Sequence, residues 1–420
     1  MKLDFQGGVA FGRKNGGRFV HEIDEYNDCS AVCFKLKPGA EVELRTDAGE
    51  KVRRGNLLAV VDGTPVHSSV SGVFNGKAQI SGSDYLVVTS DGKLEETKLY
   101  SPETRAITDI SGSELITLAR RYGIYDTRSG KKLWRMLDAA ENGSERVVID
   151  CTESDFSATI STSLCRQYAK DIVFGAKMLI HTVGASKCVF ALTENQKSAL
   201  DALSKEAEDK KLFAFGILKE KYPIGDRGLV AALYLKELAY GETAAENGYF
   251  IVGAETAKAF YDSVKRGKPQ LDRYISVCGK GFGEEKNLKV PFGITLHDIV
   301  DICGGLKKGY LPIENDLFSG EKAYGALGAG VRTLIAVRPK NNKSFECVFC
   351  YECVRVCPMK LYPLRAITGE VDETLYRNCN ECNACEYICP SGIPLASIIN
   401  SRDISEVGEE DDEDTGVTTV

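Results

Sequence analysis

The sequence has no long apolar run free of charged residues, so it offers no segment suited to crossing a bilayer. Its most apolar long stretch, residues 171–192, is interrupted by Lys177, His181 and Lys187. The first residues, MKLDFQGG, lack the apolar core of a secretory signal. We therefore expect a soluble protein of the cytoplasm, either free or at the periphery of a membrane complex.

The sequence also lacks a surplus of basic residues. The 53 Lys and Arg residues face 60 Asp and Glu residues, which gives a formal charge of −7. Residues 402–420 hold eight acids and one base, so the rest of the chain is neutral. A neutral body argues against nucleic acid as a partner, because phosphate binding needs a basic surface. The acidic tail, residues 401–420, is predicted to be disordered.

Several motifs of enzyme chemistry are missing as well. No G-x-G-x-x-G follows a predicted strand, and no Ser/His/Asp array or paired-carboxylate motif is evident. The four histidines have no metal-ligand spacing and are interpreted as structural. The sequence therefore assigns no catalytic residue.

The first part of the chain is predicted to be β-structure. Residues 40–92 alternate apolar and polar positions between frequent glycines, and they resemble a biotinyl/lipoyl-type barrel-sandwich module. The hairpin predicted to carry the cofactor in such modules, residues 63–67, has no lysine. We therefore expect this module to be structural.

From residue 145 the pattern changes to alternating strands and helices. Strands are predicted at residues 147–149, 188–192 and 212–218, with helices at 163–179 and 195–211 between them, which predicts parallel pairing. Residues 273–303 are predicted to form a hairpin followed by a short helix, and residues 339–344 a linker.

The strongest signal is a duplicated cysteine motif near the C-terminus. The pattern C-x-x-C-x-x-C-x-x-x-C-P occurs twice, once from Cys347 to Pro358 and again from Cys379 to Pro390. In two-cluster ferredoxins the fourth cysteine of each run ligates the other cluster. We therefore assign two [4Fe–4S] clusters: cluster one to Cys347, Cys350, Cys353 and Cys389, and cluster two to Cys357, Cys379, Cys382 and Cys385. Zinc is the alternative, since it also takes four thiolates, but its sites rarely use this triple spacing.

These segments, CVFCYECVRVCPMKLYPLRAI and CNECNACEYICPSGIPLASII, closely resemble the RnfC family, the C subunits of Rnf electron-transport complexes. The resemblance also covers GGV near the start, KYPIGDRGLV, and VKRGKPQLDRYISVCGKGF. It implies a multidomain α/β and α+β protein: a barrel-sandwich domain (1–100), an α/β domain like the flavin-binding domain of respiratory complex I (101–265), an SLBB β-grasp domain (266–335) and a helical two-cluster ferredoxin domain (340–400).

The resemblance further implies NADH oxidation through FMN, but the flavin segments depart from the family pattern. The family loop G-x-G-G-A-G-F-P-T-x-x-K is aligned with residues 123–132, where Gly123, Gly130 and Lys132 remain and Asp126 adds a negative charge. Few glycines leave little room for a phosphate against the backbone. Of the family segment N-x-x-E-C-E-P, this sequence keeps Glu153. The family segment Asn-Val-x-Thr-Ala is aligned with residues 253–257, which are Gly-Ala-Glu-Thr-Ala. FMN is therefore not expected. If it binds, Gly123, Gly130, Lys132 and Glu153 are its candidate residues.

Three functions remain open from the sequence. The first is an electron-transfer protein that serves a partner oxidoreductase through two clusters. Its degenerate flavin loop resembles the RnfC-like branch encoded with proline reductase in amino-acid-fermenting anaerobes, so proline reductase is a candidate partner. The second is an NADH-oxidising subunit of an Rnf-type complex, and the third is a docking scaffold with structural clusters. Cys29 and Cys33 could form a redox pair or a metal site, but they are interpreted as buried thiols. Cys151 follows a strand where the family places its flavin segment, so a reactive thiol is an alternative there. Residues 222–226 are interpreted as a tight turn.

Overall fold

A computed structural model describes residues 2–10, 20–80, 82–97, 100–140, 143–237, 244–339, 343–369 and 377–400. Within these ranges, none of the helices combines the length and apolar character that a bilayer crossing needs. The acidic tail lies outside the described residues, as do positions 340–342 of the expected linker.

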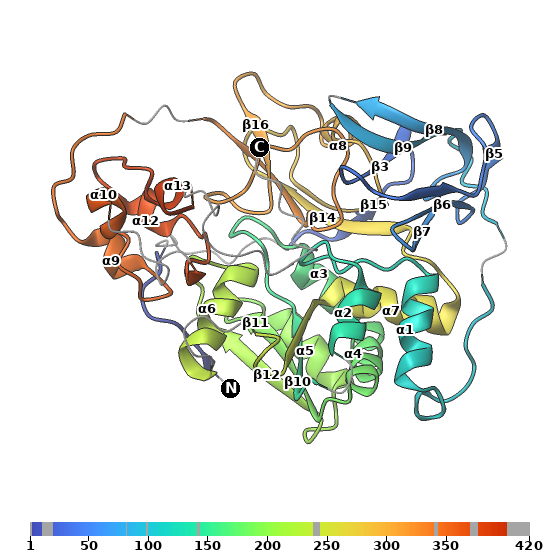
Figure 1. Cartoon of the computed structure of the whole chain (residues 1–420), viewed down its shortest axis with the longest axis horizontal. Coiled ribbons are helices and arrows are strands. Elements are labelled where there is room, and N and C mark those ends of the chain that lie inside the picture. Colours follow the sequence, from blue (N-terminus) through green and yellow to red (C-terminus); the bar gives the residue numbers. More distant parts are fainter. Residues whose placement is uncertain are drawn as a thin grey trace.

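A five-stranded parallel sheet forms the centre of the molecule, in the order β1-β12-β11-β10-β13 (Figure 1). The strands predicted near 147, 188 and 212 are confirmed. The sheet is built from β1 (Lys2–Leu3), β10 (Arg146–Asp150), β11 (Lys187–Thr193), β12 (Phe213–Leu218) and β13 (Tyr249–Gly253). Its helices are α1 (Gly112–Arg121), α2 (Leu133–Ala140), α3 (Ile160–Gln167), α4 (Ala169–Val183), α5 (Lys197–Glu206), α6 (Gly225–Glu237) and α7 (Ala254–Arg266), with a 3-10 turn at Ile107–Asp109.

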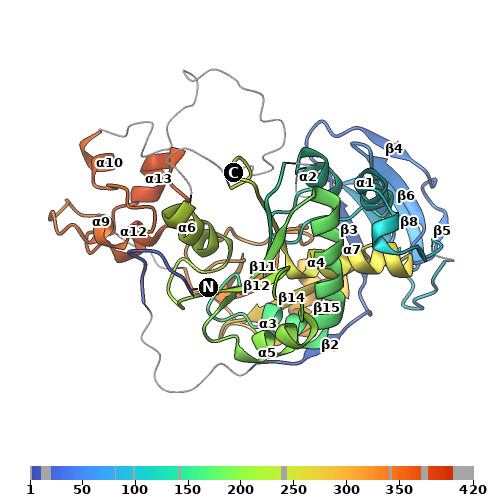
Figure 2. The ribbon, with the colours of Figure 1, turned by 90° about the horizontal axis from the view of Figure 1, so that it is seen from below.

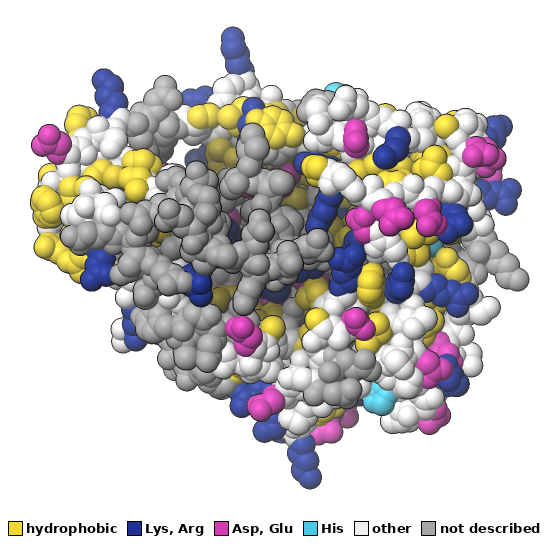
Figure 3. Space-filling model, viewed as in Figure 1, with side chains coloured by type: hydrophobic (Ala, Val, Ile, Leu, Met, Phe, Trp, Pro, Cys, Tyr) yellow, Lys and Arg dark blue, Asp and Glu magenta, His cyan; other side chains and the backbone are white. Residues whose placement is uncertain are grey.

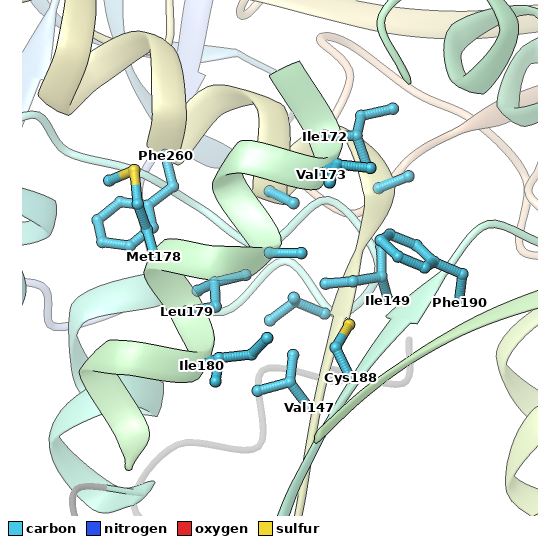
Figure 4. Close-up of a cluster of buried hydrophobic side chains, with 14 of the residues drawn as sticks. Val147, Ile149, Ile172, Val173, Met178, Leu179, Ile180, Cys188, Phe190 and Phe260 are labelled. Atoms are coloured by element: carbon cyan, nitrogen blue, oxygen red, sulfur yellow. The ribbon is translucent and has the colours of Figure 1, made fainter. Parts of the chain in front are cut away.

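Alternation along β10 gives the sheet two buried faces. Val147 and Ile149 pack against α4, together with Phe190 of β11 and Leu179 of α4 (Figure 4). Val148 belongs to a second cluster on the other face, with residues of α6 and of the C-terminal segment. Because successive strand side chains point to opposite faces, one strand anchors both layers.

Two expected helices differ from the structure. The helix expected over residues 163–179 is two helices, because Tyr168 leaves the helical backbone at φ −120° and ψ 28° between α3 and α4. The Tyr168 ring packs against that of Tyr274, 5.8 Å between centroids, and this contact favours the break. The helix expected over residues 195–211 ends at Glu206, since Asp209 instead accepts hydrogen bonds from the backbone of Lys211 and Leu212.

The N-terminal β-structure forms two antiparallel sheets, ordered β3-β9-β8-β5 and β4-β6-β7. The turn of the hairpin lies at Asp62 and Gly63, both with positive φ, rather than over residues 63–67, because Thr64–His67 already form β7. The strands are β3 (Ala31–Lys35), β4 (Val42–Leu44), β5 (Lys51–Val52), β6 (Leu57–Val61), β7 (Thr64–His67), β8 (Gly72–Ile80) and β9 (Ser83–Ser90).

A second five-stranded sheet, β16-β17-β14-β15-β2, shares a hydrophobic core with these N-terminal sheets. The hairpin and helix predicted over residues 273–303 are confirmed by antiparallel β14 and β15 and by α8. The elements are β2 (Ile23–Glu25), β14 (Asp272–Cys278), β15 (Lys286–Pro291), α8 (Leu296–Ile302), β16 (Leu311–Glu314) and β17 (Thr333–Val337). Although β1 and β2 fall within the expected first domain, they pair with β12 and β15.

The C-terminal segment forms a small helical lobe at one side of the molecule, next to α6 (Figures 1 and 2). Its helices are α9 (Glu352–Val356), α10 (Arg365–Thr368), α12 (Ala384–Ile388) and α13 (Leu395–Asn400). The lobe holds both cysteine repeats, so the chemistry predicted from the sequence is concentrated here.

Candidate functional site

The eight cysteines of the two repeats line two separate cavities of the lobe, four to each. Three cysteines come from one repeat and the fourth from the other. We name these cavities by their positions. The outer cavity is lined by Cys347, Cys350, Cys353 and Cys389. The inner cavity is lined by Cys357, Cys379, Cys382 and Cys385.

The two repeats have the same backbone conformation around their first three cysteines. Phe349 and Tyr351 have φ values of 53° and 59°, and the corresponding Glu381 and Asn383 have 53° and 56°. Non-glycine residues adopt this left-handed conformation at a free-energy cost, which is tolerated where the surrounding structure requires it. Its repetition at matching positions indicates that both loops are shaped for the same purpose.

The donor set suits a four-iron cluster. A cluster binds one thiolate at each of four different irons, so its ligands surround a wider space than those of a single ion. Across the described ranges, no group of three or more His, Cys, Asp or Glu side chains was found that could hold one metal ion. Backbone N–H groups also donate to the sulfurs: Phe349 to Cys347 Sγ and Leu361 to Cys357 Sγ, both at 3.3 Å. Such bonds tune the potential of a bound cluster.

The two cavities differ in how deeply their thiols lie. Cys350 of the outer cavity is exposed, whereas Cys382 and Cys385 of the inner cavity are buried. Burial raises the pKa of Cys382 to about 12 and that of Cys379 to about 11. These thiols are therefore protonated at neutral pH when nothing is bound, and coordination would release their protons.

The inner cavity lies against the body of the protein. The Tyr222 hydroxyl donates to the carbonyl oxygen of Cys382 and to Asp316 Oδ1, the latter at 3.2 Å. Arg227 Nε of α6 donates to the carbonyl oxygen of Asn380 at 3.0 Å. The sequence predicts only a turn at residues 222–226, and the structure adds this contact with the cysteine loop.

The N-terminal segment also contacts the inner cavity, next to Tyr222, with which Val9 exchanges backbone hydrogen bonds. The Gly8 N–H donates to the carbonyl oxygen of Val356 at 2.8 Å. Gly7 has φ +71°, and a Cβ at this position would lie 2.7 Å from the carbonyl oxygen of Cys357. Only glycine permits both the conformation and the close approach. The GGV sequence near the start therefore has a structural role beside the cysteines.

At the segments aligned with the family's flavin site, an internal carboxylate occupies the N-terminus of α7. Asp126 Oδ1 accepts hydrogen bonds from the Gly253 N–H at 2.9 Å and from Thr256 Oγ1 at 2.8 Å. Its Oδ2 accepts two more from Ser129, at 3.0 Å from the backbone N–H and 2.6 Å from the hydroxyl. A helix N-terminus is an anion site, and here the chain supplies the anion itself.

The surroundings of Asp126 keep it charged. Burial by itself would raise its pKa, but nearby Arg128 and the hydrogen bonds from Gly253, Ser129 and Thr256 lower the pKa below its ordinary value. Two further buried carboxylates, Asp150 and Glu255, line a small cavity beside the same helix end, together with Arg332. Each lies near an arginine, with Asp150 Oδ2 3.6 Å from Arg332 Nη2 and Glu255 Oε1 3.2 Å from Arg273 Nε. The positive charges here are thus matched by acids of the protein, and Asp126 already accepts the nearby donors, so the residues present do not fit the phosphate of FMN.

The four residues assigned to a flavin are occupied in other ways. Gly123 lies against the carbonyl oxygen of Pro65, and Gly130 against the backbone of Gly330. Lys132 Nζ lies 3.5 Å from Asp62 Oδ2. Glu153 accepts hydrogen bonds from the backbone N–H groups of Ser161 and Thr162 at the start of α3. The structure therefore does not gather these four residues around one ligand site.

The seven cysteines outside the lobe are buried, as expected. Burial, with neighbouring Cys165 and Asp150, raises the pKa of Cys151 well above its ordinary value, and burial raises that of Cys29 to about 12. The thiolates of Cys151 and Cys29 are therefore disfavoured, and these two cysteines are poor nucleophiles.

A further cavity of about 270 Å³ lies between β2, α7 and β14. Several of its charged side chains form ion pairs, for example Arg54 with Asp272 at 2.8 Å and Lys258 with Asp262 at 2.6 Å. We assign this cavity no function.

Comparison with known proteins gives consistent relatives. Residues 127–262 match the family described as the Nuo51 FMN-binding domain. The chain is 26% identical over 409 residues to the C subunit of the proton-translocating ferredoxin:NAD(+) oxidoreductase complex of Clostridium ljungdahlii, covering 91% of this chain and 87% of the relative. It is 26% identical to the Na(+)-translocating counterpart of Acetobacterium woodii, with 84% and 83% covered. The resemblance to the RnfC family expected from the sequence is confirmed over most of the chain.

The match to the flavin domain defines which part of this chain is similar to the complex I subunit. It begins one residue after Asp126 and covers the central α/β sheet from β10 to β13. The α/β fold of that domain is therefore present, with Asp126 directly before the matched residues. Among solved structures, an NAD+-reducing [NiFe]-hydrogenase in the H2-reduced state aligns with TM-score 0.44 and 12% identity, over 71% of this chain and 62% of that one.

Proposed function

We propose that this RnfC-like protein transfers single electrons between protein partners through two [4Fe–4S] clusters and binds no FMN. The observation that carries the proposal is the sharing of cysteines between two cavities, three from one repeat and one from the other. Two adjacent cubes held this way would supply one-electron transfer with no bond made or broken.

The residues around the cavities support a fixed position for both clusters. Tyr222, Arg227 and Gly8 hold the inner loops against the body through hydrogen bonds. The outer loop leaves Cys350 exposed. The inner cluster would thus be shielded from water, while the outer one would be accessible to a partner.

The domain organisation fits this function. We propose that the sheets containing β3 to β9 form the barrel-sandwich module, the sheet containing β14 and β15 the SLBB β-grasp domain, and residues 340–400 the ferredoxin domain. Pro65 lies in the hairpin of the barrel-sandwich module. Trp134 packs near this hairpin, and its Nε1 donates a hydrogen bond to Thr64 Oγ1 at 2.9 Å. This module would support the α/β domain rather than carry a cofactor.

The partners are proposed from the relatives. The named relatives belong to ferredoxin:NAD(+) oxidoreductase complexes, so we propose that this chain exchanges electrons with a ferredoxin-type carrier or with another member of such a complex. The resemblance to the branch encoded with proline reductase makes that enzyme a further partner to test.

One observation favours a second function. The match of residues 127–262 to an FMN-binding domain supports an NADH-oxidising flavoprotein, whereas the contacts of Asp126 argue against it. The third function, a scaffold with structural clusters, would require clusters that accept no electrons.

Anaerobic purification followed by iron, flavin and redox assays separates the three. The proposal requires roughly eight iron atoms per chain, no FMN, and bleaching of the visible absorbance by dithionite. One FMN per chain with cluster reduction by NADH would establish the flavoprotein instead. Clusters that dithionite cannot reduce would support the third function, a docking scaffold with structural clusters.

A further inference from the structure

The outer cavity opens among exposed apolar side chains. Val348 is 67% exposed and Phe345 66%, although both are large hydrophobic residues. Val348, Tyr351 and Ile367 line the cavity itself, and the Tyr351 and Tyr362 rings lie 6.3 Å apart. Figure 3 shows hydrophobic side chains gathered over α9 and α10 at the edge of the lobe. We call these residues the apolar rim: Phe345, Val348, Phe349, Tyr351, Tyr362 and Ile367.

The rim is unusual within the described structure. Among the described residues, fourteen large hydrophobic residues are exposed, and six of them belong to this rim. Clustered exposed apolar side chains mark interaction sites, whereas single ones are ordinary. Aromatic residues are also enriched in protein interfaces. The exposed thiol of Cys350 lies within the same stretch of chain, between Phe349 and Tyr351.

Charged residues border the rim. Arg355 and Glu352, both on α9, form an ion pair with each other, and the exposed Lys343 and Glu346 flank Phe345 along the chain. The surface is thus apolar at its centre with charges of both signs at its edge, which is the arrangement found in protein interfaces. Redox encounters characteristically use small interfaces.

Building on the proposed function, we infer that the apolar rim is the docking site of an electron-carrier protein whose own redox centre lies near its surface. Docking there would cover the outer cluster, exclude water from it and place the two centres close together. Each encounter would move one electron between the outer cluster and the carrier, with the carrier as oxidant or reductant. The inner cluster would then communicate only through the outer one on this side of the molecule.

The test compares two double variants of the cluster-loaded full chain. Phe345→Ser with Tyr362→Ser removes two rim side chains that do not line the outer cavity. Leu44→Ser with Ile80→Ser is the matched control, because both residues are exposed on β4 and β8 in the N-terminal sheets, at the opposite side of the molecule (Figure 2). Cluster content is checked by iron assay and by dithionite bleaching.

The probe is an oxidised bacterial ferredoxin with two [4Fe–4S] clusters. We expect the rim variant to weaken ferredoxin binding about tenfold, measured as Kd by titration calorimetry, and to slow stopped-flow electron transfer from the dithionite-reduced chain equally. The control should stay within twofold of the wild type. Equal Kd for the rim variant and wild type would overturn the docking site, as would a wild type with reducible clusters that does not bind ferredoxin. A wild type without reducible clusters would instead refute the proposed function.

Discussion

The carboxylate of Asp126 lies 2.9 Å from the backbone nitrogen of Gly253 and occupies the N-terminus of α7. An ionised side chain of the protein thus accepts the Gly253 N–H and the Thr256 hydroxyl, donors that would otherwise be available to a bound anion. If the domain binds no FMN, as proposed, this carboxylate still neutralises the helix end.

Removing this carboxylate should uncover an anion site. We expect Asp126→Ala to lower the free energy of unfolding by about 2 kcal/mol, since buried donors lose their acceptor. Inorganic phosphate should then raise the Tm of this variant but not that of the wild type. Asp126→Asn, which keeps an acceptor oxygen, is the control and should respond little to phosphate. An equal phosphate response in the wild type would show that Asp126 does not fill the site.

The crossover of the fourth cysteines predicts which cluster each substitution removes. Cys357→Ala should disturb the cluster bound by Cys379, Cys382 and Cys385 and leave the outer one, so that iron falls from roughly eight to roughly four atoms per chain. Cys353→Ala is the matched control and should remove the outer cluster. Electron paramagnetic resonance distinguishes the remaining clusters. Loss of the outer cluster from the Cys357 variant would contradict the assignment.

Gly7→Ala should loosen the cysteine lobe. The new Cβ would meet the carbonyl oxygen of Cys357 at 2.7 Å in a left-handed backbone conformation. Gly39→Ala is the control, because Gly39 has φ +75° but nothing within 4 Å of a Cβ. The control should lose about 1 kcal/mol of stability, and Gly7→Ala more than that, together with part of its iron. Thermal unfolding and iron content measure both, and equal losses would argue against the close contact.

Arg227 should raise the potential of the inner cluster. Its guanidinium donates to the carbonyl oxygen of Asn380, and a positive charge stabilises a cluster that has gained an electron. Arg227→Met should lower one midpoint potential by roughly 50 mV, from a charge interaction of about 1 kcal/mol. Arg355→Met is the control, since this exposed arginine is paired with Glu352. Redox titration measures the midpoint potentials. An unchanged potential of the inner cluster in Arg227→Met would contradict the role of Arg227.

His67 should make stability depend on pH. Burial lowers its pKa from 6.5 to about 4, so between these values the unfolded chain binds a proton that the folded chain does not. Stability is therefore full above about pH 6.5 and falls as the pH is lowered, by about 2 kcal/mol between pH 7 and 5. Urea unfolding followed by the fluorescence of Trp134, the single tryptophan, measures this. His67→Gln should remove this part of the slope, whereas His297→Gln, at an exposed position, should not.

The sequence predicts best what depends on local spacing. The cysteine motif and the strands near 147 and 188 are patterns within a few residues, and the structure has the cavities and strands there. Tyr168, at the break, packs against Tyr274, and Asp126 accepts a hydrogen bond from Gly253, more than a hundred residues away in each case. Contacts at such separation leave no periodic signal, so the bulk and charge of Asp126 could be noticed but not its contact at the N-terminus of α7.

The pairing of Lys2 with Ile217 has a consequence for the order in which the protein is assembled. During synthesis the first strand leaves the ribosome long before its neighbour β12 exists, so it must wait without a partner while most of the α/β domain forms. Gly7 and Gly8 lie a few residues further along and can take their places beside Val356 only after Val356 itself has been synthesised. Residues 2–9 are thus among the last described parts to reach their final contacts.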